Sequence, residues 1–213
     1  MSDKNKRLNK IILAPDEMGN SDIYALIFSS WMSESGENIK SVFSTLQFSM
    51  QHPDAASIWV YFDDSHLYGF AFFTRSSTLA NAVRLNYLAV NPLYRRTGLG
   101  KEIIEDAKRN FNIINLISSN KNTEFYKKCG FFEAGTSNDN KKIMFYNRSK
   151  EILPTLNSLE FVICGLNPRQ VDIDWKRIKY LFLTQLKGGI GDVEFNKLVK
   201  LNGVNLELIN RTT

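Results

Sequence analysis

The chain has 213 residues, of which 43% are hydrophobic and 12% aromatic, and it carries a net charge of +5 with a pI near 9.1. This composition excludes a disordered chain, and two cysteines and two histidines, none at metal-ligand spacing, exclude a disulfide framework and predict no metal site. No apolar run approaches the ~20 residues of a membrane span or forms a signal peptide, so we expect a cytoplasmic protein without membrane contact. The basic residues are dispersed, so nucleic-acid binding is possible but only weakly indicated.

The first half of the chain predicts an edge strand, two helices and a pair of strands. Apolar residues that recur at i, i+3, i+4 and i+7 indicate the helices, and β-branched and aromatic runs indicate the strands. Ser21 or Asp22 can cap the first helix, and Gly36 separates it from the second. The predicted elements are a strand at 10–14, a helix from 21–22, a helix at 38–50, and strands at 57–62 and 67–74.

The next stretch combines a strand, a basic loop with two glycines, and a helix. An apolar strand at 81–90 ends before Pro92, which has no N–H to give to a sheet. The first N–H groups of a helix at 99–111 have no intrahelical partner and lie at the positive end of its dipole. Gly98 and Gly100 carry no Cβ, so an anion can approach the backbone closely. The basic residues of this loop are Arg95, Arg96 and Lys101.

A parallel strand and a second short motif follow the helix. The apolar run at 112–118 predicts the strand, and Gly130 suits the left-handed position that follows a helix. Two further strands, at 131–134 and 142–146, are expected after this glycine. Beyond residue 148 the predicted elements are a strand at 159–164, helices at about 172–187 and 192–201, a turn at 202–203 and a strand at 204–209.

Two of these segments resemble motifs of one known family. The segment RRTGLGK at 95–101 resembles the acetyl-CoA pyrophosphate loop of the GNAT N-acetyltransferase superfamily, whose pattern is Q/R-x-x-G-x-G/A. The segment FYKKCGF at 125–131 resembles the end of the family's second motif, N-x-x-A-x-x-F-Y-x-x-x-G-F. Their order, with one apolar strand between them, strengthens the match, and the resemblance covers about residues 10–148.

The resemblance implies an α+β fold of the GNAT type. This fold has a mostly antiparallel central sheet with one splayed parallel strand pair and flanking helices. We therefore expect an acetyltransferase domain at 1–148 and a small α/β extension at 149–213, which carries no resemblance. The extension is too short to be confidently a free-standing domain. It could pack on the acetyltransferase domain or on a partner chain, a homodimer included.

The resemblance also implies acetyl-CoA as cofactor and direct acetyl transfer to a primary amine, of a small molecule or a protein, in a ternary complex. At the family's usual asparagine position this chain has Ser119, flanked by Asn120 and Asn122, and which of the three contacts the cofactor is open. The residues expected to bind the cofactor are Leu88, Ala89, Val90, Arg95, Arg96, Thr97, Gly98, Leu99, Gly100, Lys101, Ser119, Asn120, Asn122 and Tyr126.

For catalysis, the resemblance assigns the general acid to Tyr126. A phenol, with a pKa of ~10, suits a thiolate leaving group better than a carboxylic acid does. The strand before the loop offers Arg84 and Asn86 but no carboxylate, so we expect no dedicated base, or deprotonation through ordered water. The remaining titratable candidates are Asp63, Asp64, His66 and Glu124. Two alternatives stay open: a regulatory acyl-CoA-binding protein without turnover, and an acetyltransferase acting on a nucleic-acid-associated substrate.

Overall fold

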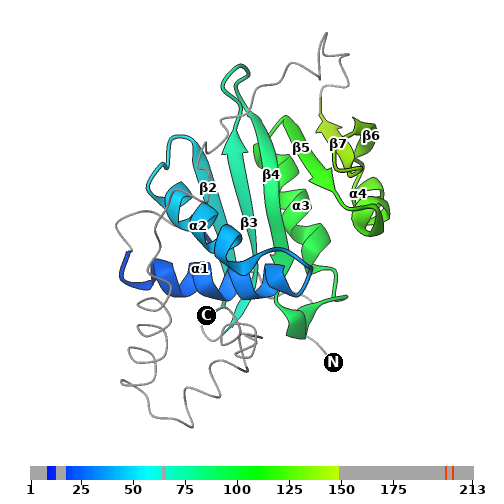
Figure 1. Cartoon of the computed structure of the whole chain (residues 1–213). Helices are drawn as coiled ribbons and strands as arrows, with labels where there is room; N and C mark the ends of the chain where they lie inside the picture. Colours follow the sequence, from blue (N-terminus) through cyan, green and yellow to red (C-terminus); the bar gives the residue numbers. More distant parts are fainter. Residues whose placement is uncertain (1–8, 13–17, 64–65, 149–199, 201–202, 204–213) are drawn as a thin grey trace.

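The computed structural model describes residues 9–12, 18–63, 66–148, 200 and 203. They form a seven-stranded sheet in the order β1-β2-β3-β4-β5-β7-β6, and Figure 1 shows α1 and α2 on one face and α3 on the other. The strands are β1 (Asn9–Ile12), β2 (Ala56–Phe62), β3 (Leu67–Arg75), β4 (Ala82–Val90), β5 (Ile113–Ser118), β6 (Phe132–Thr136) and β7 (Lys142–Asn147). The α-helices are α1 (Met18–Ser33), α2 (Ile39–Met50), α3 (Leu99–Asn110) and α4 (Thr123–Lys128).

The elements predicted up to residue 148 are present, and the first helix differs most from its prediction, at its start. α1 begins at Met18, so Ser21 and Asp22 lie inside the helix rather than at its cap. Serine and aspartate can cap a helix, but they do not force it to begin where they stand. The second helix begins as predicted, because the Asn38 side chain accepts a hydrogen bond from the Ser41 amide at 3.1 Å.

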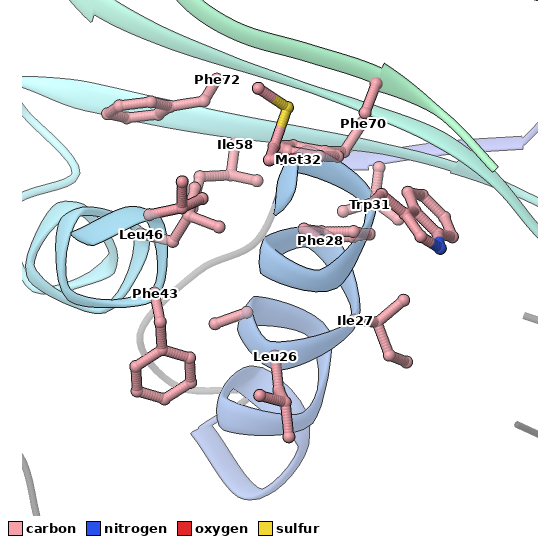
Figure 2. Packing of buried hydrophobic residues seen from close by; sticks show 14 of the residues in the cluster. Leu26, Ile27, Phe28, Trp31, Met32, Phe43, Leu46, Ile58, Phe70 and Phe72 are labelled. Atoms are coloured by element: carbon pink, nitrogen blue, oxygen red, sulfur yellow. The ribbon is translucent and has the colours of Figure 1, made fainter. Parts of the chain in front are cut away.

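Two apolar clusters hold the sheet from opposite faces. Figure 2 shows the first cluster, where side chains of α1 and α2 pack on β2 and β3; Phe28 stacks on Phe70 with ring centroids 4.3 Å apart. In the second cluster, Ile103 and Ile104 of α3 pack on the other face. A Cβ added to Gly69 would lie 2.8 Å from Ile103 Cδ1, so this glycine lets α3 approach the sheet. The sheet, including β4, therefore lies between a layer formed by α1 and α2 and a layer formed by α3.

The parallel pair β4–β5 is short. It pairs Ala82 to Leu85 with Ile113 to Leu116, and the remainder of β4 pairs only with β3. Asn86 is the extra residue of a bulge opposite β3, which bends β4 where the pairing with β5 stops. The predicted splay is therefore present, and within the part of the chain that the structure describes no strand pairs with the second edge of the last residues of β4.

A charged cluster ties the edge strand β1 to α3. Lys10 Nζ lies 2.8 Å from Asp106 Oδ2, and the Tyr61 hydroxyl donates a hydrogen bond to the same oxygen at 2.9 Å. Burial alone would raise the pKa of Asp106, but the hydrogen bonds from Lys10 and Tyr61 lower it below its ordinary value. The Lys10 ammonium also lies 3.9 Å from the centre of the Trp59 ring.

Of the extension at 149–213, the structure describes Lys200 and Gly203. Lys200 is helical, and Gly203 has φ 59° and donates its amide to the Lys200 carbonyl at 3.1 Å. The turn predicted at 202–203 agrees with this geometry at Gly203. The other elements predicted beyond residue 148 lie outside the described residues.

Candidate functional site

A cleft of about 550 Å³ lies at the carboxyl end of β4, between the loop that leads into α3 and the short helix α4. Its walls contain most of the residues predicted to bind the cofactor. These are Leu88, Ala89, Val90, Arg95, Arg96, Gly98, Leu99, Gly100, Lys101, Asn122 and Tyr126. Thr97, Ser119 and Asn120 do not line it, and the Thr97 hydroxyl instead donates to the Tyr94 carbonyl at 2.6 Å. The structure therefore gathers two motifs that stand some 25 residues apart in the sequence.

The loop at 95–101 contains five consecutive backbone amides, those of residues 96–100, that no described residue pairs. Within the described part of the chain, no backbone carbonyl accepts from the amides of residues 96–100, and no side chain caps α3. Left-handed conformations at Arg96, with φ 66°, and at Gly98, with φ 96°, turn these amides away from the chain's own carbonyls. A non-glycine residue in this conformation costs free energy, which is typical of a binding loop. The arrangement can bind a phosphate group.

Gly100 faces the interior of the cleft. A Cβ built on this glycine would point toward Phe125 Cζ at 3.4 Å and Val90 Cγ2 at 3.7 Å, and both residues line the cleft. These are ordinary contact distances, so the protein itself tolerates a methyl group there. Because Gly100 has no side chain, space remains open beside the loop amides.

An ion pair joins this loop to the turn between α1 and α2. Arg95 Nη2 lies 3.0 Å from Glu34 Oε2, and Arg95 Nε donates to the Val90 carbonyl at 3.4 Å. Ser35, the neighbour of Glu34, lines the cleft. The α1–α2 turn is thus part of the site, although it precedes the loop by about sixty residues in the sequence.

Tyr126 lines the cleft from α4. Its ring meets Phe125 and Phe131 edge-on, with centroids 5.0 and 5.7 Å away. Burial raises the pKa of Tyr126 well above its ordinary value, and the nearby Cys129 thiol adds to the shift. Among the described residues none is hydrogen-bonded to its hydroxyl. The phenol therefore stays protonated at neutral pH and can donate to a group in the cleft.

The three alternatives for the family's asparagine position differ in their surroundings. Asn122 lines the cleft, and Asn120 is exposed. The Ser119 hydroxyl oxygen is buried, and no residue of the described part of the chain is hydrogen-bonded to it. Of the three alternatives, Asn122 is therefore the one that the structure places in the cleft wall.

Of the candidate bases, the three described ones, Asp63, His66 and Glu124, do not line the cleft. The Asp63 carboxylate accepts from the Tyr68 hydroxyl at 2.7 Å and from the His66 amide at 2.9 Å, which fixes the β2–β3 hairpin. Glu124 pairs with Lys127 at 3.2 Å on the exposed side of α4. Asp64 lies outside the described residues. On β4, the Arg84 guanidinium donates to Asn115 Oδ1 at 2.9 Å, across the parallel pair.

Sequence reasoning missed three residues of the cleft. Tyr94 directly precedes the loop, and Phe125 belongs to the quoted second motif, so proximity to the motifs could have found both. Ser35 carries no such signal, because only the folded sheet brings the α1–α2 turn beside the loop.

Two further kinds of feature are absent from the described residues. None of their helices has the length and apolar character needed to cross a membrane. No three His, Cys, Asp or Glu side chains in this part of the chain are grouped so that they could hold a metal ion.

Comparison with known proteins finds a family match for part of this chain. Residues 54–133 match the family model described as an acetyltransferase (GNAT) domain. A GNAT-family protein from Desulfovibrio desulfuricans is 15% identical over 67% of this chain and 99% of its own, with a TM-score of 0.53. An acetyltransferase from Thermus thermophilus is 14% identical over 66% of this chain and 96% of its own, also with a TM-score of 0.53.

A chimera of the spermidine N-acetyltransferase from Vibrio cholerae is 18% identical over 67% of this chain and 98% of its own, with a TM-score of 0.50. No curated protein matches the sequence. At these identities the solved structures establish the fold, and the family model covers every described residue of the cleft wall except Ser35. Residues 54–133 are therefore a GNAT acetyltransferase domain, within a GNAT fold that includes the described helices and strands from β1 to β7.

Proposed function

We propose that this chain is an N-acetyltransferase that transfers an acetyl group from acetyl-CoA to a primary amine by direct attack in a ternary complex. The observation that supports the proposal is the run of amides at 96–100, unpaired among the described residues, which borders the same cleft as the end of β4 and Tyr126. A phosphate site, a strand edge and a proton donor are what a long phosphate-bearing thioester requires.

The residues of the cleft fit acetyl-CoA in three respects. The loop amides, with Arg96 and Lys101 beside them, suit its pyrophosphate. The edge of β4 that β5 leaves unpaired suits the amide groups of its pantetheine arm. The space beside Gly100, which has no side chain, leaves room for a ligand next to the loop amides. Bound there, acetyl-CoA would supply an activated acetyl thioester.

The chain's own groups can serve the transfer in two ways. Backbone amides near Val90 can polarise a carbonyl, in the manner of an oxyanion hole. The Tyr126 hydroxyl can donate to the departing sulfur. Because burial raises the pKa of Tyr126 above the ~8.5 of an ordinary thiol, a strong hydrogen bond to the sulfur is favoured over complete proton transfer. With no carboxylate in the cleft lining, water would take the proton that the attacking amine loses.

Calorimetry followed by a thiol-release assay tests the proposal. The full chain should bind acetyl-CoA, and should release free thiol when an amine from a panel is added. Spermidine belongs in this panel, because one protein of similar fold is a spermidine N-acetyltransferase. Acetyl-CoA binding without thiol release on any amine would favour a regulatory acyl-CoA-binding protein. Absence of acetyl-CoA binding would refute both functions.

A further inference from the structure

Gly203, one of the two described residues of the extension, lies against the turn that follows β4. A Cβ added to Gly203 would lie 2.5 Å from Asn91 Oδ1 and 2.9 Å from Pro92 Cδ, so the backbone of Gly203 lies against this turn. Gly203 also has φ 59°, a left-handed conformation that side chains with a Cβ disfavour. Both the close approach and the backbone conformation therefore require glycine at this position.

The turn that Gly203 contacts anchors the loop of the cleft. Asn91 Nδ2 donates to the Leu67 carbonyl at 2.8 Å, and Asn91 Oδ1 accepts from the Leu93 amide at 3.0 Å. The Asn91 side chain is 0% exposed, although it directly follows β4 and opens the connection to α3. Asn91 thus holds the start of the loop against the first residue of β3, and Gly203 lies against the atom that makes one of these bonds.

We infer that the C-terminal extension docks on the Asn91–Pro92 turn through Gly203 and thereby holds the cofactor loop in its binding conformation. The family match ends at residue 133, and the solved structures of similar fold cover 66–67% of this chain while matching 96–99% of their own. The extension is therefore an addition to the common fold. Its contact with the turn favours packing on the acetyltransferase domain, one of the two alternatives left open by the sequence.

The physical consequence follows from the position of the turn. The amides at 96–100 bind an anion only while the loop keeps its left-handed residues, and that conformation starts from the turn. A contact that restricts the turn reduces the ordering that ligand binding must otherwise supply. The docking itself does not depend on the proposed function, whereas its effect on acetyl-CoA affinity rests on it.

The test uses the full chain with Gly203→Asn and Gly203→Ala. Asparagine tolerates the left-handed conformation better than alanine does. The effect of Gly203→Asn therefore reports mainly the collision of the added Cβ with Asn91, whereas Gly203→Ala adds backbone strain to that collision. Gly135→Ala is the matched control, because a Cβ at Gly135 meets nothing within 4 Å. Hydrogen exchange of peptides that cover residues 88–101 reports on the loop without any ligand, and calorimetry gives the acetyl-CoA affinity.

We expect both Gly203 variants to increase amide exchange in this peptide and to weaken acetyl-CoA binding about 3- to 10-fold, with no change in the control. Unchanged exchange in both variants would overturn the docking, whatever the affinity. Faster exchange with unchanged acetyl-CoA affinity would overturn the claim that docking supports the cofactor loop. If the wild-type chain binds no acetyl-CoA but exchange still increases in the variants, the proposed function fails while the docking stands.

Discussion

Adding one methyl group at Gly98 or at Gly100 should have opposite effects on stability, although the two residues are neighbours in one loop. Gly98 has φ 96° and nothing within 4 Å of an added Cβ, so the only cost of Gly98→Ala is conformational. A left-handed alanine costs about 1–2 kcal/mol. We expect the free energy of unfolding to fall by that amount, which corresponds to a decrease in Tm of about 2–8 °C.

Gly100 lies in the first turn of α3, and its added Cβ would make ordinary contacts with Phe125 and Val90. Alanine is a better helix former than glycine by about 0.5–1 kcal/mol, so Gly100→Ala should stabilise the protein by up to that amount. The resembled loop pattern also admits alanine at this position. Acetyl-CoA affinity should therefore stay within a few-fold of wild type in Gly100→Ala, and should drop about 10-fold or more in Gly98→Ala, because the loop amides lose their alignment.

Urea denaturation and calorimetry measure both quantities on the same protein preparations. Gly135→Ala serves as the control, since its Cβ meets nothing and lies in β6. Equal stability of Gly98→Ala and wild type would refute the assignment of a left-handed cap. If the Gly98 and Gly100 variants bound acetyl-CoA equally well, the loop amides would not be the phosphate site.

Three further predictions concern the cleft and the edge of the sheet. Tyr126→Phe should slow thiol release about 100-fold with unchanged acetyl-CoA affinity; an unchanged rate would remove the tyrosine from the chemistry. Glu34→Gln removes the carboxylate 3.0 Å from Arg95 and should tighten acetyl-CoA binding about 2- to 5-fold at low salt, an effect that high salt should abolish. Asp106 has a lowered pKa, so it contributes stability above the ordinary carboxyl pKa of ~3.9 and loses this contribution as the pH falls through its folded value. Asp106→Asn should therefore be less stable than wild type to urea at pH 7, with the gap closing below about pH 4; a gap independent of pH would contradict the role of its charge.

The local sequence was sufficient to predict the loop at 95–101 and the strand and helix on either side of it. Pro92 ends the ladder because it has no N–H, and Gly98 takes the left-handed position in front of α3. Both effects arise within a few residues, so they need no knowledge of the fold. The apolar run of β5 also predicted a buried parallel strand, which the pairing with β4 confirms. The start of α1 was predicted wrongly, because capping residues mark where a helix can begin but do not require it to begin there.

The sequence by itself thus determined the conformation of the loop in front of α3, because amide orientation depends on backbone angles set by neighbouring residues. Tertiary structure alone decided what surrounds that loop. The Glu34–Arg95 ion pair, the place of Ser35 in the cleft and the contact of Gly203 with Asn91 join segments distant in sequence. No local pattern encodes such contacts, since they depend on how the helices and the extension pack on the finished sheet.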